Sequence, residues 1–195
     1  MPLRLAASAL LLVATTACTA VIEPPAAPAE PQSVFVLDHG RHSSLVLPGD
    51  GGGLVRYSYG DWDWYALEKT GLFRGSSAVL WPTRAGFGRR ELAGTATASS
   101  VRVAVRVGVE HLYEVVVDAR EAAALRRRLD ALFHAADSTL VYNEAYDLEF
   151  VHHPEKYWAF RNSNQMVARW LERLGCRVRG PALFSRWRVE ASPSR

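Results

Sequence analysis

The first third of the predicted domain consists of short apolar runs separated by polar turns. Apolar side chains dominate residues 34–37 and 44–48, and they alternate with polar ones over residues 54–60. Alternation with a period of two is typical of strands that bury one face. Gly40 follows the first run and GDGGG follows the second, and both favour tight turns. The pattern therefore predicts a small antiparallel meander with polar residues at its ends.

Two further patterns predict a strand hairpin and a helix in the middle of the chain. Residues 101–107 alternate apolar and polar side chains, and residues 112–118 form a second apolar stretch, so we expect two strands. Asp118 is a favourable N-cap, with Glu121 at the spacing of a capping box. The helix that follows is expected to end near Ala136. Its buried stripe repeats at helical spacing and comprises Leu125, Leu129, Leu132 and Phe133.

Other stretches of the middle region are less regular. Asp61 is a candidate N-cap for a short helix with two tryptophans in its first turn and Gly71 as its end. Residues 72–100 are rich in glycine and small polar side chains, and we interpret them as loop. Residues 139–151 are expected to be extended or irregular.

The clearest single pattern is a late amphipathic helix. Asn162 can start it, Ser163 then lies in its first turn, and Gly175 ends it. Its apolar face consists of Met166, Val167, Trp170, Leu171 and Leu174. Short closing strands are expected around RVRG and RWRVE near the C-terminus. Antiparallel strands with interposed helices indicate the α+β class, a small antiparallel sheet with packed helices.

The N-terminal segment indicates export. Residues 1–18 contain a basic start, a short apolar run and small residues ending at Cys18, which is the pattern of a secretory signal. They resemble a bacterial lipoprotein signal, in which Cys18 becomes the lipidated N-terminus on the periplasmic face of the cell envelope; cleavage after Ala17 or Ala20 is the alternative. Residues 19–32 are rich in proline and alanine and are expected to form an extended tether. Residues 33–195 then form one domain.

Composition narrows the chemistry. With Cys18 lipidated, Cys176 has no partner for an intramolecular disulfide. No cysteine or histidine group has metal-ligand spacing, so neither a metal nor another cofactor is predicted. The net charge is +3 with scattered basic residues, and the run Arg126-Arg127-Arg128 is expected to be the solvated face of a helix. A nucleic-acid partner is therefore not expected.

Two places concentrate polar side chains where a site would need them. The sequence HGRHS, from His39 to Ser43, follows the first predicted strand, and NSN, from Asn162 to Asn164, begins the late helix. A serine hydroxyl needs a base to become a nucleophile, and histidine is the base suited to neutral pH. The positive end of a helix dipole also favours developing negative charge. His42 and Ser163 are accordingly candidate catalytic residues.

These motifs carry a resemblance to known proteins. HGRHSSLVLP, YGDWDWY and NSNQMVARWLERLGCRV resemble a family of uncharacterised exported bacterial proteins, whose pattern runs roughly as HGWHTGIVLP, WGDxxFY and CNTWxxxxLxxxG. The same order of histidine strand and late helix resembles circularly permuted papain-like proteins, including the lecithin-retinol acyltransferase group and permuted relatives of NlpC-type cell-wall peptidases. The resemblance implies that His42 is the catalytic histidine, Asp61 the acidic residue that orients it, and Ser163 the residue at the position of the family's cysteine.

Each candidate also has a simpler interpretation. Ser163 could serve as a helix cap, and His39 could be the imidazole in question instead of His42. Asp61 could be only an N-cap. The orienting group could then be another polar residue of the neighbouring loops, namely Asp63, Asn143 or Asp147.

The resemblance implies an envelope hydrolase or acyltransferase that acts on an amide or ester bond, with cell-wall peptide or lipid as substrate and the membrane reached through the lipid anchor. Serine at the thiol position leaves two alternatives, because a hydroxyl is far less ionised than a thiol. One is a catalytically degenerate lipoprotein that binds wall peptide or lipid. The other is a structural envelope lipoprotein.

Overall fold

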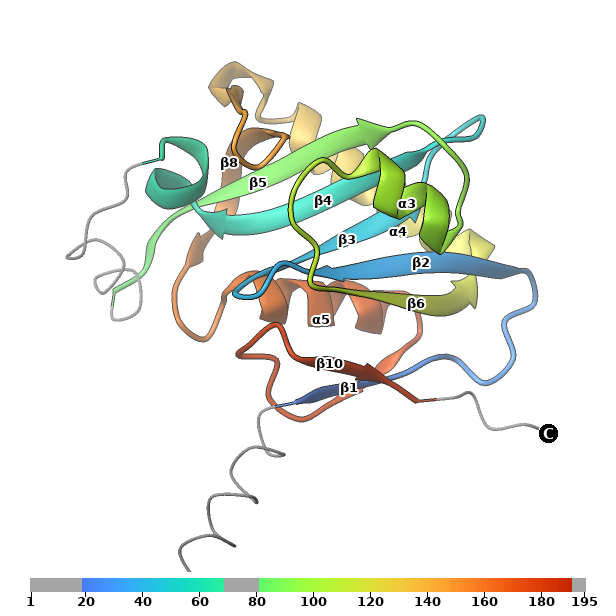
Figure 1. Cartoon of the computed structure of the whole chain (residues 1–195). Helices are drawn as coiled ribbons and strands as arrows, with labels where there is room; N and C mark the ends of the chain where they lie inside the picture. Colours follow the sequence, from blue (N-terminus) through green and yellow to red (C-terminus); the bar gives the residue numbers. More distant parts are fainter. Residues whose placement is uncertain (1–18, 69–80, 191–195) are drawn as a thin grey trace, which may run out of the picture.

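The central element is an antiparallel β-sheet. The computed structural model describes residues 19–68 and 81–190 (Figure 1). Within these residues seven strands pair in the order β6–β2–β3–β4–β5–β8–β7. The strands are β2 (Pro31–Asp38), β3 (Ser43–Pro48), β4 (Leu54–Asp61), β5 (Thr83–Leu92), β6 (His111–Asp118), β7 (Val141–Asn143) and β8 (Leu148–Tyr157). The predicted meander β2–β3–β4 is confirmed, and so is the α+β class.

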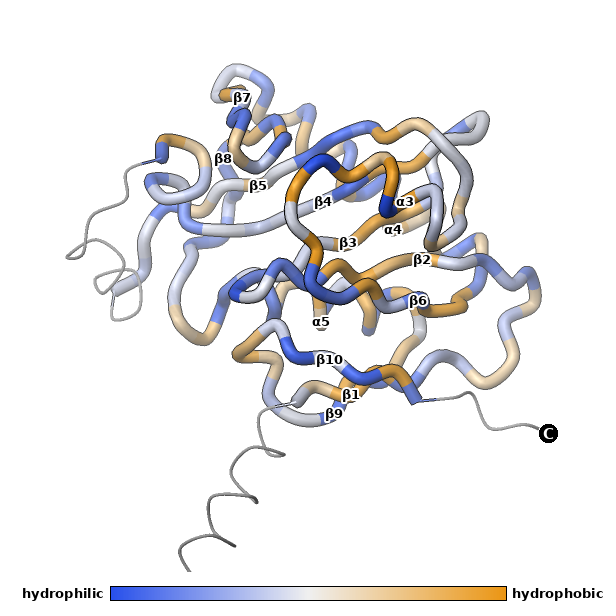
Figure 2. Tube along the Cα trace, viewed as in Figure 1, coloured by the Kyte–Doolittle hydropathy of each residue, from blue (hydrophilic) through white to orange (hydrophobic). Residues whose placement is uncertain are grey.

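Helices cover both faces of this sheet because its strands are apolar on both sides. Leu45 and Leu47 of β3 pack in one cluster with α4 (Ala119–His134) and α5 (Ser163–Arg173). Val46, between them, points to the opposite face and packs with α3 (Ala98–Ala104). Figure 2 shows the apolar positions running along β2 and β3 through the middle of the molecule. None of the helices in the described residues is long and apolar enough to span a bilayer.

The predicted strand over residues 101–107 is wrong, because residues 101–104 form the second half of helix α3 and residues 105–107 belong to no strand. Thr97 caps α3 by accepting a hydrogen bond from the backbone N–H of Ser100 at 3.3 Å. Val101 is fully buried, whereas Val103 is 86 % exposed, so the alternating valines do not share one buried face. The cap signal just upstream outweighed the alternation.

The stretches that lack a sequence pattern contain long strands. β5 lies within residues 72–100 and pairs with both β4 and β8 near the centre of the sheet. β7 and β8 account for most of residues 139–157, and a short 3₁₀ turn η2 (Asp137–Thr139) precedes them. Glycines explain why β5 gave no signal: Gly86 and Gly88 face the rings of Trp62 and Phe150, where a side chain would clash or crowd.

The segment expected to be an extended tether contributes to the core. β1 (Ala20–Glu23) pairs in parallel with β10 (Trp187–Val189) and antiparallel with β9 (Arg177–Arg179). Ala20 and Ile22 are fully buried, so the first part of the expected tether is a core strand instead. The apolar positions of this short strand are buried by pairing with strands more than 150 residues away, which local composition does not reveal. Residues 1–18 and Gly71 lie outside the described residues.

Candidate functional site

The loop HGRH is a tight turn between β2 and β3. The backbone N–H of His39 donates to the carbonyl oxygen of His42 at 2.9 Å. Gly40 adopts a φ of 90°, which favours glycine, and its N–H donates to the buried carboxylate of Asp38 at 2.7 Å. The turn therefore fixes both imidazoles at the end of the sheet.

His39 is held at both ring nitrogens. Its Nδ1 lies 2.6 Å from the carbonyl oxygen of Gly108, and its Nε2 lies 2.9 Å from the hydroxyl of Ser44. A carbonyl can only accept, so Nδ1 carries the proton and Nε2 is the acceptor. Burial and the nearby Arg56 lower the pKa of His39 to about 4, so the ring is neutral near pH 7. His39 is fixed in one tautomer.

His42 is the less constrained imidazole. Its ring stacks on His39 with centroids 4.8 Å apart, and the rings of Tyr65 and Tyr146 approach it edge-on at 5.2 and 5.7 Å. Within the described residues no hydrogen bond to its ring nitrogens is recorded. Burial, then His39 and Arg56, lower the pKa of His42 to about 3. It presents a neutral ring whose nitrogens are not committed to a neighbour.

Arg56 is a buried cation beneath this pair, and the sequence analysis did not identify it. Its Nε donates to the Ser44 hydroxyl at 3.1 Å and its Nη1 to the Tyr146 carbonyl at 3.1 Å. Its Nη2 lies 3.3 Å from Nε2 of His39, and the side chain is 1 % exposed. Burial lowers its pKa to about 10, so it is still charged near pH 7. An arginine among the large side chains of the predicted strand LVRYSYG was the available signal.

Asn162, not Ser163, is the cap of α5. The side-chain oxygen of Asn162 accepts from the backbone N–H groups of Asn164 and Gln165, both at 3.0 Å. Its amide donates to the carbonyl oxygens of Ala159 at 3.2 Å and Leu183 at 3.0 Å. The Ser163 hydroxyl makes no hydrogen bond in the described part of the chain, and the residue is 3 % exposed. The capping interpretation therefore does not account for Ser163.

The start of α5 meets the histidine loop. The side-chain amide of Asn164 lies 3.5 Å from the carbonyl oxygen of Arg41 and 3.3 Å from that of Leu183. The hydroxyl of Ser185 donates to the carbonyl oxygen of Gly40 at 2.7 Å. Ser163 precedes Asn164 in the chain and His42 follows Arg41, so both candidates neighbour this contact in sequence. No hydrogen bond between the side chains of Ser163 and His42 is recorded within the described residues.

Both carboxylate oxygens of Asp61 are hydrogen-bonded to groups outside the histidine loop. One of its carboxylate oxygens accepts from the backbone N–H of Trp64 at 2.9 Å, and the other accepts from the Thr83 hydroxyl. It thereby caps the short π-helical turn η1 (Trp62–Ala66), which confirms the predicted N-cap. Neither oxygen has a recorded bond to an imidazole. The link from Asp61 to His42 runs only through η1, whose Tyr65 contacts the His42 ring.

The other candidates for an orienting group have different partners. Asn143 donates to the Tyr65 carbonyl oxygen at 2.7 Å and accepts from the Tyr146 N–H at 3.2 Å. It therefore holds both tyrosines that contact His42. Asp147 accepts from the hydroxyl of Tyr142 at 3.0 Å. Asp63 lies in the first turn of η1.

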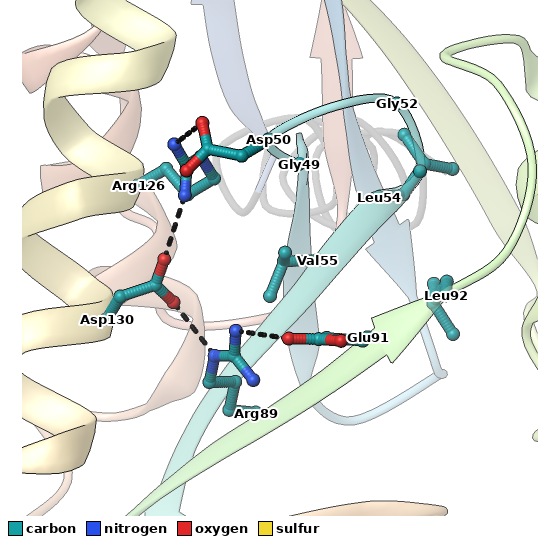
Figure 3. A pocket seen from close by; sticks show the side chains of 11 residues that line it. Gly49, Asp50, Gly52, Leu54, Val55, Arg89, Glu91, Leu92, Arg126 and Asp130 are labelled. Carbon is teal, nitrogen blue, oxygen red and sulfur yellow. Dashed lines mark hydrogen bonds and ion pairs between the residues drawn. The ribbon is translucent and has the colours of Figure 1, made fainter.

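A separate cavity lies beside the loop from Gly49 to Gly53. Its volume is about 280 Å³, and its charged lining includes Arg89, Arg126 and Asp130 (Figure 3). Asp130 bridges the two arginines, with contacts of 2.8 and 3.0 Å, and Asp50 caps Arg126. Each guanidinium already has carboxylate partners, so we interpret these charges as a structural ion-pair network that lines the cavity.

Comparison of the chain with protein-family models, with curated proteins and with solved structures finds no match. Among the described residues, no three histidine, cysteine or acidic side chains are grouped so that they could hold a metal ion. The chemistry of the site therefore has to be argued from its own side chains.

Proposed function

We propose that this protein is a lipid-anchored envelope protein with a permuted papain-like arrangement, whose site hydrolyses or transfers an acyl group at an amide or ester bond. The observation that carries the proposal is the contact between Asn164 and the Arg41 carbonyl oxygen at 3.5 Å. It joins the start of a late helix to a histidine turn 123 residues earlier. A helix start with an unbonded hydroxyl and a turn with an unbonded imidazole supply the nucleophile and the base that acyl transfer uses.

The proposed roles follow from the atoms of Ser163 and His42 that have no recorded hydrogen-bond partner within the described residues. The Ser163 oxygen attacks the substrate carbonyl carbon while His42 takes the hydroxyl proton. His42 then gives that proton to the departing amine or alcohol, which leaves an acyl-serine. Water or a second alcohol, deprotonated by His42, releases the acyl group and restores Ser163. His39 and Tyr65 hold the His42 ring between them.

The first turn of α5 offers one backbone donor for the oxyanion. The N–H groups of Asn164 and Gln165 are occupied by the Asn162 side chain, and that of Met166 by the Asn162 carbonyl oxygen. The N–H of Ser163 makes no hydrogen bond within the described residues. It is therefore available to a negatively charged oxygen at the positive end of the helix.

Specific observations favour a second function, a degenerate site that binds a wall peptide or lipid without turnover. The pKa of His42, lowered to about 3, makes it a weak base, and Asp61 is bonded elsewhere. Serine also stands where the resemblance places a thiol. A neutral imidazole among tyrosine rings can still bind a polar ligand by hydrogen bonding and stacking.

Fluorophosphonate labelling tests the proposal. We expect Ser163 to be labelled in the folded protein, and labelling to be lost in Ser163→Ala and His42→Ala. Ser99→Ala is the matched control, since Ser99 is an exposed serine on α3 far from the histidines in sequence. Two results would contradict acyl transfer through this pair: no labelling of the folded wild-type protein, or labelling of His42→Ala as fast as that of the wild type.

The variant Ser163→Cys separates the two functions. If the surroundings can activate a nucleophile, the new thiol has a pKa below its ordinary value and reacts quickly with iodoacetamide at pH 7. His42→Ala in the same background should then slow the alkylation. Cys176 contributes little background because burial raises its pKa to about 12. An ordinary thiol that is insensitive to His42 supports the binding function.

A further inference from the structure

A membrane-facing surface is suggested by where the folded chain begins. Strand β1 starts at Ala20, two residues after Cys18, and the backbone N–H of Ala20 donates to the carbonyl oxygen of Arg186 at 2.9 Å. Two residues span at most about 7 Å. A lipid on Cys18 would therefore hold this end of the molecule against the bilayer with almost no freedom, in place of the longer tether that the sequence suggested.

Two exposed aromatic side chains lie at the same end. Phe160 and Phe184 are 60 % and 55 % exposed. Their loops are joined by one side chain, since the amide of Asn162 donates to the carbonyl oxygens of Ala159 and Leu183, the residues that precede them. In Figure 1 the loop that leads into β10, the start of α5 and the start of β1 lie at this one end of the molecule.

Two arginine side chains of this end are available to anionic lipid headgroups. Arg41 and Arg186 are exposed, and neither makes an ion pair within the described residues. The carbonyl oxygen of Arg186 accepts from β1, and that of Arg41 accepts from the start of α5. Phenylalanines flanked by unpaired arginines are the composition of surfaces that enter the headgroup region of anionic membranes.

We propose that Phe160, Phe184, Arg41 and Arg186 form a docking surface for the anionic bilayer in which the Cys18 anchor is inserted, so that the Ser163–His42 site faces the membrane surface. This proposal rests on the proposed lipid anchor and deepens the proposed function. Arg41 belongs to the histidine loop and Phe184 to the loop that holds Asn162 and Asn164. The substrate class that reaches this site is therefore an ester or amide at the headgroup of a membrane lipid.

Depth-dependent quenching tests the orientation. The lipidated full chain is reconstituted in vesicles of phosphatidylethanolamine and phosphatidylglycerol, with an environment-sensitive dye on Phe184→Cys or on Val103→Cys. Val103 is the matched control, because it is 86 % exposed but lies on α3. We expect a blue shift and strong quenching by headgroup-proximal doxyl lipid at position 184 alone. Equal quenching at both positions, or none at 184, overturns the proposal, as does mass spectrometry that finds no lipid on Cys18.

An activity comparison keeps this proposal distinct from the catalytic one. Phe160→Ser and Phe184→Ser should lower turnover of a vesicle-borne ester on the order of tenfold, since each removes apolar surface buried in the interface, and should leave turnover of a soluble ester unchanged. Equal losses on both substrates would contradict membrane docking. If the chain lacks hydrolytic activity altogether, neither the vesicle-borne nor the soluble ester is turned over, while the quenching at position 184 persists.

Discussion

Replacement of Asn162 tests how the start of α5 is held. Its side chain makes four hydrogen bonds, two accepted from the helix start and two donated to the carbonyl oxygens of Ala159 and Leu183. Loss of an N-cap costs about 1 kcal/mol, and each neutral hydrogen bond contributes about 0.5–1.5 kcal/mol. Asn162→Ala should therefore lower the free energy of unfolding by about 3 kcal/mol.

A second substitution divides this loss into its parts. Serine is also a good N-cap, so Asn162→Ser should retain the cap and lose only the two amide donors. We expect it to lower the free energy of unfolding by about 2 kcal/mol, from the two missing bonds. Urea unfolding measures both variants, with the midpoint shifting at constant slope. The reasoning is refuted if Asn162→Ala changes stability by less than about 0.5 kcal/mol, or if the two variants are equally destabilised.

Three further predictions concern the core, the histidine pair and the packing beneath it. Ile22→Ala should cost about 2–5 kcal/mol in thermal unfolding, because Ile22 is fully buried; a loss near zero would mean that β1 is not part of the core. The pKa values of His39 and His42, about 4 and 3, lie below the ordinary value of 6.5. The unfolded chain therefore binds more protons, so the stability from these two residues is complete above pH 6.5 and falls towards pH 4 by on the order of 1 kcal/mol per pH unit per histidine. Urea unfolding at several pH values in this range should show that the free energy of unfolding falls less steeply with pH in His42→Gln. An unchanged dependence on pH would contradict the lowered pKa of His42. Gly60→Ala should cost about 1–3 kcal/mol by calorimetry, because a methyl group there overlaps the ring of Tyr65, whereas Gly108→Ala, which meets open space, should be nearly neutral.

The elements with strong local signals are those that the sequence predicted. β2 and β3 follow from apolar runs, β4 follows from alternation, and α4 and α5 follow from a cap and an apolar stripe. β5 and β1 were missed because their places are set by distant partners: glycines in β5 make room for rings from elsewhere, and β1 is buried by two strands near the C-terminus. Such complementarity is not encoded in a local window.

The candidate site shows the same limit. The sequence identified His42 and Ser163 from a resemblance, and it offered His39 as an alternative without a means to decide. The structure distinguishes the two rings by long-range contacts, since Gly108 fixes His39 while the His42 nitrogens have no recorded partner within the described residues. The catalytic role of His42 stays a prediction. Asp61 follows the simpler interpretation, an N-cap, because the backbone N–H of Trp64 and the hydroxyl of Thr83 occupy its two carboxylate oxygens.

Arg56 links the electrostatics of the histidine pair to the choice between the two functions. A cation 3.3 Å from the His39 ring, itself stacked on His42, opposes any positive charge on either imidazole. Negative charge that develops beside His42 would raise its affinity for a proton. An acyl substrate held at the N–H of Ser163 would supply that charge as an oxyanion, whereas a ligand that is merely bound would not. Burial, His39 and Arg56 thus keep His42 neutral in the empty site. Under the two proposed functions, a substrate that develops negative charge would favour catalysis by the pair, whereas a ligand without such charge would meet only a neutral binding surface.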